Sequence, residues 1–313
     1  MNLKDKTTKF TEIAIITSIM TIFIFLGLYA IPIIFILYPV PFIVLAVRHG
    51  IKYSIMSILV SCALASILIE FFVGVFIFII FGAISVVLGY MINEKYKSYQ
   101  IIGGGTLISL VTVALLLYVM GIFTGINLVD PIKDFFNEAL QFQKQILGTM
   151  DFTQYEINEI LDMLKQGYNY TMLAMPTIII ISSVFLVYIN YYISVVILNR
   201  LGNKVDYIPK FKHFKLPGNV LMGILVIFLG TTIIRVLKLF YYDTIFLNVI
   251  TVLSFIFLIQ GLAVVMFFLD RKKINKFIKA ILFVLILLSG PLNIIISFIG
   301  VADILFNFRK IKR

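Results

Sequence analysis

The stretch IIGGGTLISLVTVALLLYVMGIFTGIN, residues 101–127, decides the class of fold. It holds no charged side chain, and about 20 apolar residues are enough for a helix to cross the hydrocarbon core of a bilayer. The composition of the whole chain agrees, because 61% of its 313 residues are hydrophobic, 13% are charged and the mean hydropathy is +1.09. Globular domains carry about 25% charged residues. A water-soluble protein is therefore excluded.

Similar apolar runs recur along the chain and predict an all-α fold, a polytopic transmembrane helical bundle of about eight or nine membrane segments. The long runs cover 13–30, 54–70, 72–92, 101–127, 170–198, 217–238 and 244–269. Two further segments are irregular. Residues 31–47 are broken by three prolines, and 280–308 is interrupted by Ser289-Gly290-Pro291. Proline removes a backbone donor and disfavours helical geometry in the residue before it, so both segments should be kinked or discontinuous.

Basic side chains stand in blocks between these runs. Lysine and arginine gather within 4–9, 48–52, 95–97, 200–215 and 271–279. If 31–47 crosses the membrane, every block lies on one side, which the positive-inside rule makes cytoplasmic. The sequence therefore predicts a multi-pass plasma-membrane protein with a cytoplasmic N-terminus. The net charge of +11 then reflects topology and attraction to anionic membrane lipid rather than binding to nucleic acid.

A polar insert at 128–169 falls on the opposite, extracytoplasmic side. It carries seven acids and three lysines, a local charge of −4. Asp130, followed by proline, is typical of a helix start, and a second helix should begin at Thr153, whose capping-box partner Glu156 is three residues on. Two amphipathic helices joined near Gly148 are predicted. They could cap the outer mouth of the bundle, lie flat in the membrane interface or contact a partner.

The last apolar segment leaves two topologies open. If 280–308 is one long, tilted, proline-kinked helix, the basic tail beginning at Arg309 ends outside, against the positive-inside rule. If Gly290-Pro291 divides the segment into a re-entrant half-helix and a return helix, the tail ends inside, although each part is too short for a full span. A broken segment is tolerated in a membrane only where protein buries it or water reaches it, so it is a candidate functional element.

Signatures of catalysis are absent from the sequence. The two histidines, His49 and His213, lack zinc-protease spacing, and Cys62 is the single cysteine, so neither a metal site nor a disulfide is expected. No Gly-x-x-x-x-Gly-Lys-Ser/Thr phosphate loop occurs. We therefore expect that the protein is not an enzyme and needs no cofactor, and that any ATPase is a separate subunit.

Ionisable and amide side chains in or beside the apolar runs are the candidate binding residues, because such groups are costly within a membrane. They are Glu70, Arg235, Lys238, Asn190 and Asp303. Arg235 and Lys238 could face an outward-open cavity and bind an anionic solute, or flank a short loop with Arg235 snorkelling outward. Asp303 could serve transport or docking, or pair with Arg309. Asn190 could form an interhelical hydrogen bond or contact a ligand.

Two motifs carry a resemblance to a known family. They are YPVPFIVLAVRHGIK at 38–52 and GPLNIIISFIGVADILFNFRK at 290–310. With the segment order over nearly the whole chain, they make this sequence resemble the YybS-like family of predicted bacterial membrane proteins of unknown function. That family is similar, chiefly over its first six helices, to the substrate-binding S components of energy-coupling-factor vitamin transporters.

The resemblance implies a bacterial six-segment membrane unit over 10–200 that binds a small solute from outside. A basic cytoplasmic loop at 201–216 and a C-terminal membrane extension at 217–313 would follow, and S components lack that extension. In S components, small residues of the first helix dock a transmembrane coupling subunit. Ala14 and Ser18 are the matching positions.

Two functions remain open. The first is a solute-binding or transporter-like component that relies on a separate coupling subunit and ATPase for energy. It would have an outer cavity near Glu70, Arg235 and Lys238, with the insert as lid. The second is a non-transporting membrane scaffold or regulatory protein, whose insert and basic rim contact envelope proteins or anionic lipid.

Overall fold

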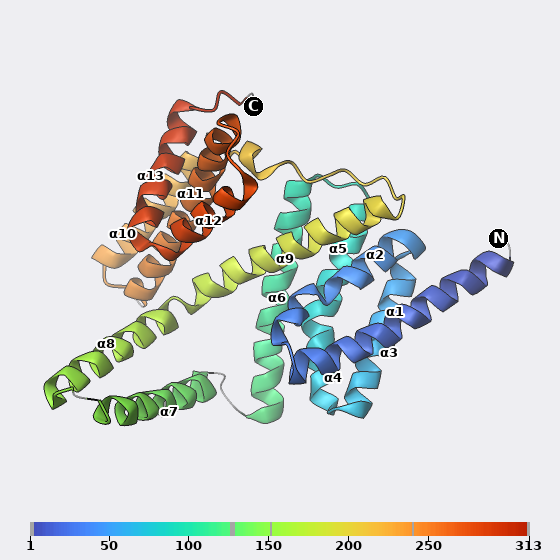
Figure 1. The fold of residues 1–313 in the computed structure, drawn as a ribbon, viewed down its shortest axis with the longest axis horizontal. Helices are drawn as coiled ribbons and strands as arrows, with labels where there is room; N and C mark the ends of the chain where they lie inside the picture. Colours follow the sequence, from blue (N-terminus) through green and yellow to red (C-terminus); the bar gives the residue numbers. More distant parts are fainter. Residues whose placement is uncertain (1–2, 126–128, 151, 240, 312–313) are drawn as a thin grey trace. The chain divides into compact units, whose positions relative to one another are not determined.

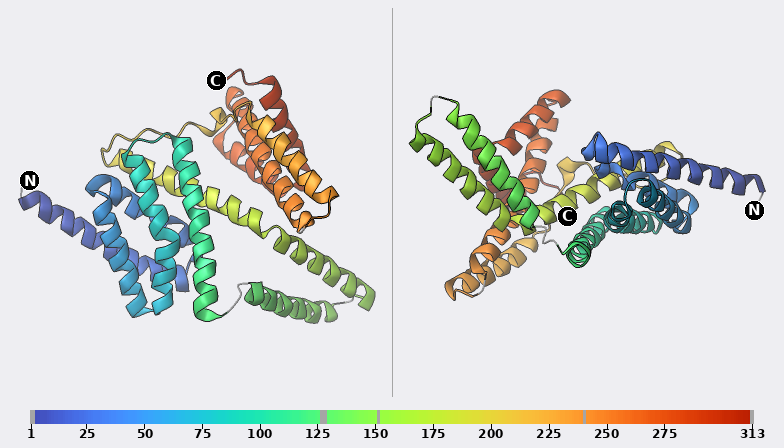
Figure 2. Two further views of the ribbon diagram at one scale, coloured as in Figure 1. Left: turned by 180° about the vertical axis from the view of Figure 1, so that it is seen from behind. Right: turned by 90° about the horizontal axis from the view of Figure 1, so that it is seen from below.

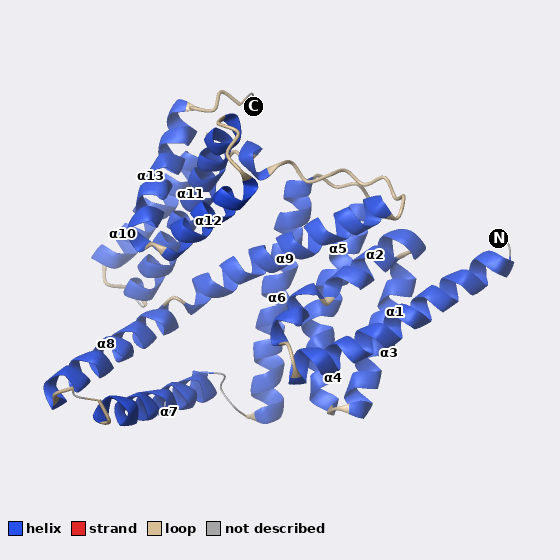
Figure 3. Ribbon diagram, in the orientation of Figure 1, coloured by secondary structure: helices blue, strands red, loops and turns tan. Residues whose placement is uncertain are grey.

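The computed structural model describes residues 3–125, 129–150, 152–239 and 241–311, and within these ranges every regular element is a helix (Figure 3). Contacts divide the chain into two units, each described here by itself. Unit 1 comprises Met1–Leu161 and Ile179–Ile208, and unit 2 comprises Asp162–Ile178 and Pro209–Arg313. Two helices run from one unit into the other, α8 (Gln154–Leu173) and α9 (Met175–Arg200) (Figure 1).

Within the described part of the chain, seven helical segments are long and apolar enough to cross a membrane. They are Phe10–Tyr29, Pro32–His49, Ile51–Leu68, Phe71–Asn93, Ser98–Phe123, Met175–Arg200 and Tyr242–Arg271. A sharply bent helix pair makes an eighth when it is counted as one segment, and α10 (Val220–Val236) is apolar but shorter. The predicted all-α, polytopic membrane fold is confirmed.

Unit 1 contains the N-terminal helices. They are α1 (Leu3–Tyr29), the 3-10 helix η1 (Pro32–Leu37), α2 (Pro39–His49), α3 (Ile51–Leu68), α4 (Phe71–Ile77), the π-helical turn η2 (Phe78–Gly82), α5 (Ala83–Asn93), α6 (Ser98–Thr124) and α7 (Val129–Gly148). Pro32 opens η1 and Pro39 opens α2, because proline suits a first helical turn, where no backbone donor is needed. The predicted irregularity of 31–47 therefore takes the form of a 3-10 turn followed by an α-helix.

Apolar packing and a few polar ties hold unit 1 together. Its largest buried cluster joins α2, α5, α6 and α9 through side chains that include Ile43, Leu88, Ile101 and Val187. Helices α1 and α3 meet at a buried hydroxyl pair, with Thr17 Oγ1 2.7 Å from Ser57 Oγ. Near the start of the apolar part of α1, Glu12 pairs with Arg48 and, at 2.9 Å, with His49 Nε2 at the end of α2.

Helices α7 and α8 form the predicted amphipathic hairpin (Figure 2). Thr153 and Glu156 make the expected capping box, because the Thr153 backbone N–H and hydroxyl each donate to Glu156 Oε2 at 2.8 Å. These two bonds hold the pKa of the Glu156 carboxyl below its ordinary value. The expected start of the first helix is wrong by about one residue, since Asp130 lies within the first turn of α7.

Unit 2 is built mainly from α10, α11 (Tyr242–Arg271), α12 (Lys276–Leu288) and α13 (Gly290–Phe306), with the short 3-10 helix η3 (Phe211–His213) before them. Helices α11 and α13 approach closely at two glycines. A Cβ atom on Gly261 would lie 1.9 Å from the Ile296 carbonyl oxygen, and one on Gly300 would lie 2.1 Å from that of Phe257. Only glycine lets the two backbones come this near.

The segment predicted at 280–308 is broken in the way its sequence indicates. Helix α12 ends at Leu288, α13 begins at Gly290, and the two axes differ by 105°. Ser289 between them is extended and Pro291 stands in the first turn of α13. At 1.5 Å per residue α13 is about 25 Å long, so its first turn reaches deep into a bilayer core of about 30 Å if its last turn lies at the surface.

Candidate functional site

The buried face of α9 carries the polar position of greatest interest in unit 1. Val187, Tyr191, Val195 and Leu198 recur at helical spacing and join the largest apolar cluster of this unit. Asn190 lies on the same face and is 0% exposed. Packing of the apolar neighbours therefore holds the Asn190 amide in the interior of unit 1, with no surface exposed to solvent.

Asn190 uses only half of its hydrogen-bonding capacity. Its Nδ2 donates to the Ile36 carbonyl of η1 and to the Leu186 carbonyl, both at 2.8 Å. In the 3-10 pattern the partner of the Ile36 carbonyl would be the nitrogen of Pro39, which has no hydrogen to donate. The side chain of Asn190 supplies a donor there, so the proline of α2 and the asparagine of α9 are linked through one carbonyl.

Two polar atoms on this face of α9 have no hydrogen-bond partner within the described ranges. Asn190 Oδ1 is buried without a hydrogen bond, and so is the hydroxyl of Ser194, one turn further along and also 0% exposed. A buried polar group without a partner costs about 1–3 kcal/mol. Two such groups at i and i+4 on one helix face form a site that can accept a hydrogen bond from a donor group.

The other candidates in unit 1 are exposed. Glu70 stands immediately before α4, and its backbone carbonyl accepts from the Val73 N–H at 3.1 Å. Ala14 and Ser18 are exposed on α1, where the Ser18 hydroxyl donates to the Ala14 carbonyl at 2.9 Å. The two positions predicted to dock a partner therefore lie on a face of α1 that the described residues leave uncovered.

Arg235 and Lys238 lie at one end of α10 in unit 2, and both are exposed. The Arg235 guanidinium stands over the ring of Phe246 at 4.5 Å from the centroid, a cation–π contact. Lys238 follows in a turn with a positive φ of 49°. Among the described residues, no hydrogen bond or ion pair joins any two of the five candidate binding residues.

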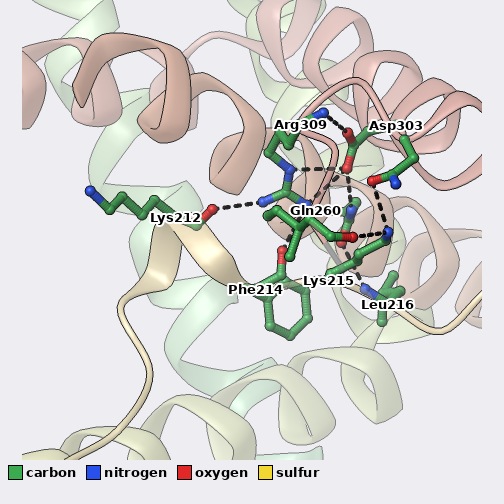
Figure 4. A network of polar contacts seen from close by, with 9 residues as sticks. Lys212, Phe214, Lys215, Leu216, Gln260, Asp303 and Arg309 are labelled. Atoms are coloured by element: carbon green, nitrogen blue, oxygen red, sulfur yellow. Dashed lines mark hydrogen bonds and ion pairs between the residues drawn. The ribbon is translucent and has the colours of Figure 1, made fainter. Parts of the chain in front are cut away.

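Asp303 forms a fully buried ion pair with Arg309, and both side chains are 0% exposed. Arg309 Nη2 and Nε donate to Asp303 Oδ2 at 2.8 and 3.1 Å. The same guanidinium donates to the backbone carbonyls of Lys212 and Phe214, each at 2.8 Å. The fork of Arg309 thus ties α13 to the loop that precedes α10 (Figure 4).

Further polar contacts extend this pair into a network that we call the polar clamp. Its members are Lys212, Phe214, Lys215, Leu216, Gln260, Asp303, Asn307 and Arg309. Gln260 of α11 donates to Asp303 Oδ2 at 2.8 Å and accepts from the Leu216 N–H at 3.0 Å. Lys215 Nζ donates to Asn307 Oδ1 at 2.8 Å. The ionised and amide groups at its centre are hydrogen-bonded, which suits a structural tie.

The polar clamp lies where both ends of the bent pair α12–α13 meet one loop. Lys212 Nζ pairs with Asp270 at 2.9 Å, and Asp270 also pairs with Lys279 in the first turn of α12. The backbone of the same Lys212 receives Arg309, just beyond α13. The first turn of α12 and the residues just beyond α13 therefore both connect to the loop before α10. A re-entrant hairpin would have this arrangement. The predicted break is confirmed, and its re-entrant form stays a prediction that these contacts favour.

Sequence reasoning singled out Asp303, Arg309 and Asn190 but missed the roles of Lys212 and Asp270. Both residues lie in or beside basic segments, which in the sequence indicate only membrane topology. No local pattern pairs them, because 58 positions separate them in the chain. The single signal in the sequence is that Asp270 is an acid immediately before a run of basic residues, Arg271-Lys272-Lys273.

The fold and these sites define a class: a polytopic membrane protein, all-helical in its described part, with a sharply bent helix pair near the C-terminus. The chain belongs to the family described as "Predicted membrane protein (DUF2232)", whose model matches residues 18–304. It is similar to the uncharacterized protein YybS of Bacillus subtilis (strain 168), with 24% identity over 276 residues that cover 88% of each chain. No solved structure matches the chain.

Proposed function

We propose that this protein is the solute-binding component of a membrane transport system and draws its energy from a separate partner. In this proposal it spans a bacterial plasma membrane with its N-terminus in the cytoplasm. It catalyses no reaction of its own. The solute is small and carries a hydrogen-bond donor, such as a hydroxyl, amine or amide N–H.

The observation that carries the proposal is the unsatisfied pair on α9. Asn190 Oδ1 and the Ser194 hydroxyl are buried among apolar helices and lack partners in the described chain. Membrane helices rarely keep such groups unless water, another helix or a ligand uses them. A ligand donor group that reached this face of α9 would supply the hydrogen bonds that these atoms lack.

Two further features support a separate source of energy. The sequence contains no phosphate loop, so ATP hydrolysis would belong to another subunit. The small residues Ala14 and Ser18 are exposed on α1, where a coupling transmembrane subunit could pack closely. The resemblance of 10–200 to S components points the same way. Arg235 and Lys238 enter the proposal as cations that attract an anionic solute.

The test compares two buried serines of unit 1. Ser194 lacks a partner among the described residues, whereas the Ser85 hydroxyl of α5 donates to the Phe81 carbonyl of the preceding η2 turn at 2.7 Å. Both residues are 0% exposed. Native mass spectrometry of the mildly solubilised protein should detect a bound small molecule. We expect Asn190→Ala and Ser194→Ala to lose it and Ser85→Ala to retain it. Absence of a stoichiometric small molecule under several extraction conditions would contradict the proposal.

A specific observation favours a second candidate, a membrane scaffold or regulator that contacts envelope proteins or anionic lipid. The polar clamp is internally bonded, while Lys272, Lys273 and Lys276 beside it are exposed and have no acidic partner among the described residues. Such cations attract an anionic membrane surface. The same mass spectra separate the two functions, because a scaffold would retain phospholipid or envelope proteins and no solute.

A further inference from the structure

Helix α7 carries two apolar stripes side by side, and only one of them is covered. Leu140 and Leu147 face α8, where they pack with Ile157 and Leu161. The neighbouring stripe, which we call the outer stripe, consists of Ile132, Phe135, Ala139 and Phe142, and all four are exposed. The two phenylalanines are 74% and 63% exposed. The hairpin with α8 therefore covers the Leu140 stripe, and the outer stripe is left uncovered by the described part of the chain.

The polar side of α7 is strongly acidic. Asp130, Asp134 and Glu138 follow one another at intervals of four residues and are all exposed. At 3.6 residues per turn they lie together on the side of the helix away from the Leu140 stripe. Aromatic and aliphatic side chains on one side with acids on the other are typical of a helix that lies at a boundary between an apolar phase and water.

The chain itself keeps α7 beside the membrane. The spanning part of α6 ends at Phe123 and α7 begins at Val129. Six Cα steps of at most about 3.6 Å allow a separation of about 22 Å. At the other end of the hairpin, α8 runs into the membrane helix α9 with Ala174 alone between them. Both ends of the hairpin are therefore joined closely to membrane helices, and the bilayer is the apolar phase nearest to the outer stripe.

We infer that α7 lies in the membrane–water interface on the side where α6 leaves the bilayer, with the outer stripe among the acyl chains. Phe135 and Phe142 insert below the headgroups, and Asp134 and Glu138 face water. The acidic side chains of α7 also favour the bilayer as the phase that covers the outer stripe. In this orientation they point away from the negatively charged phosphates of the lipid headgroups. The hairpin is then an interfacial anchor rather than a lid, and this holds whether or not the protein binds a solute.

Spin labelling of the full-length protein in lipid nanodiscs tests the placement. Single cysteines replace Phe135 and Phe142 in the outer stripe and Asp134 and Glu138 on the acidic side. The native Cys62 is buried at 4% exposure, and the unsubstituted protein reports any label that it takes up. Collision with oxygen, which concentrates in lipid, is compared with collision with a water-soluble nickel chelate.

We expect labels at Phe135→Cys and Phe142→Cys to favour oxygen over nickel at least several-fold more than labels at Asp134→Cys and Glu138→Cys. The contrast should be the same in zwitterionic and anionic nanodiscs. Equal access of nickel to all four labels would place the outer stripe in water and overturn the inference. Protection of the two stripe labels from both reagents would also overturn it, because protein would then cover the stripe as a lid or partner does.

Discussion

At the scale of single residues, Asp303 and Arg309 form the ion pair whose burial removes most charge from water among the described ion pairs. Both side chains are fully buried, and removing two charges from water costs several kcal/mol each unless hydrogen bonds compensate. Gln260 and the carbonyls of Lys212 and Phe214 provide those bonds. The carboxylate and the guanidinium therefore depend on each other and on a loop that is distant in sequence.

Breaking this pair from one side should be more harmful than removing both charges. We expect Asp303→Asn and Arg309→Met, singly, to cost about 3–5 kcal/mol, because each leaves a buried charge without its partner. The double variant should lose less than the sum of the two. Unfolding of purified protein in detergent measures all three, and purely additive losses would contradict the expectation.

A surface ion pair supplies the control. Lys165 and Asp162 lie 3.1 Å apart on α8 with both side chains more than half exposed. Exposed pairs contribute about 0–1 kcal/mol. Asp162→Asn should therefore leave the unfolding transition nearly unchanged in the same experiment.

At the scale of elements, the close approach of α11 to α13 determines how the second helix of the bent pair is held. Gly261 and Gly300 face the backbone of the opposite helix at distances that exclude a side chain. In lipid, helices associate through close packing rather than through the hydrophobic effect. The two glycines therefore stabilise the contact between α11 and α13 by letting their backbones pack closely.

Adding one methyl group at this contact should be costly. Gly300→Ala would place a Cβ 2.1 Å from a backbone oxygen, so the helices must separate, at about 1–3 kcal/mol. Gly230→Ala in α10 is the matched control, because a Cβ there meets nothing within 4 Å and alanine favours a helix by about 1 kcal/mol. The midpoint temperature of thermal unfolding, measured in detergent, should decrease for Gly300→Ala and stay the same or increase for Gly230→Ala.

At the scale of the whole molecule, the return of the chain at Ser289 decides on which side the C-terminus lies. A single kinked span would carry the basic tail to the side opposite the loop before α10. Contacts of Lys212 with Asp270 and with Arg309 instead bring both ends of α12–α13 to that loop. We therefore expect the tail to lie on the same side as the other basic segments, in agreement with the positive-inside rule.

Labelling of single cysteines in sealed membrane vesicles checks this topology. Lys210 before α10 and Lys310 after α13 are both exposed, so Lys210→Cys and Lys310→Cys should react with an impermeant maleimide from the same side. Glu138→Cys in the hairpin should react from the other side, because α9 crosses between it and Lys210. Labelling of positions 210 and 310 from opposite sides would show that the last segment crosses the membrane once.

Much of the fold could be read from local patterns. The apolar runs predicted the membrane segments, and the capping box of Thr153 and Glu156 placed the start of α8. The site could be predicted only in part. Asn190 and Asp303 were recognisable as polar groups that need partners, but the carbonyl of Ile36 and the side chain of Gln260 were not recognisable as those partners.

Hydropathy, proline positions and the spacing of charged residues act over one or two helical turns or over one bilayer thickness. They were therefore enough to establish a helical membrane protein, an amphipathic insert and a break at Gly290. Contacts between residues far apart in the chain decide which helices touch and bring both ends of α12–α13 to one loop. They also leave Asn190 with an unpaired oxygen among the described residues. Those contacts form only when the helices pack together. Their energy depends on how side chains of different helices fit one another, which no single segment of sequence specifies.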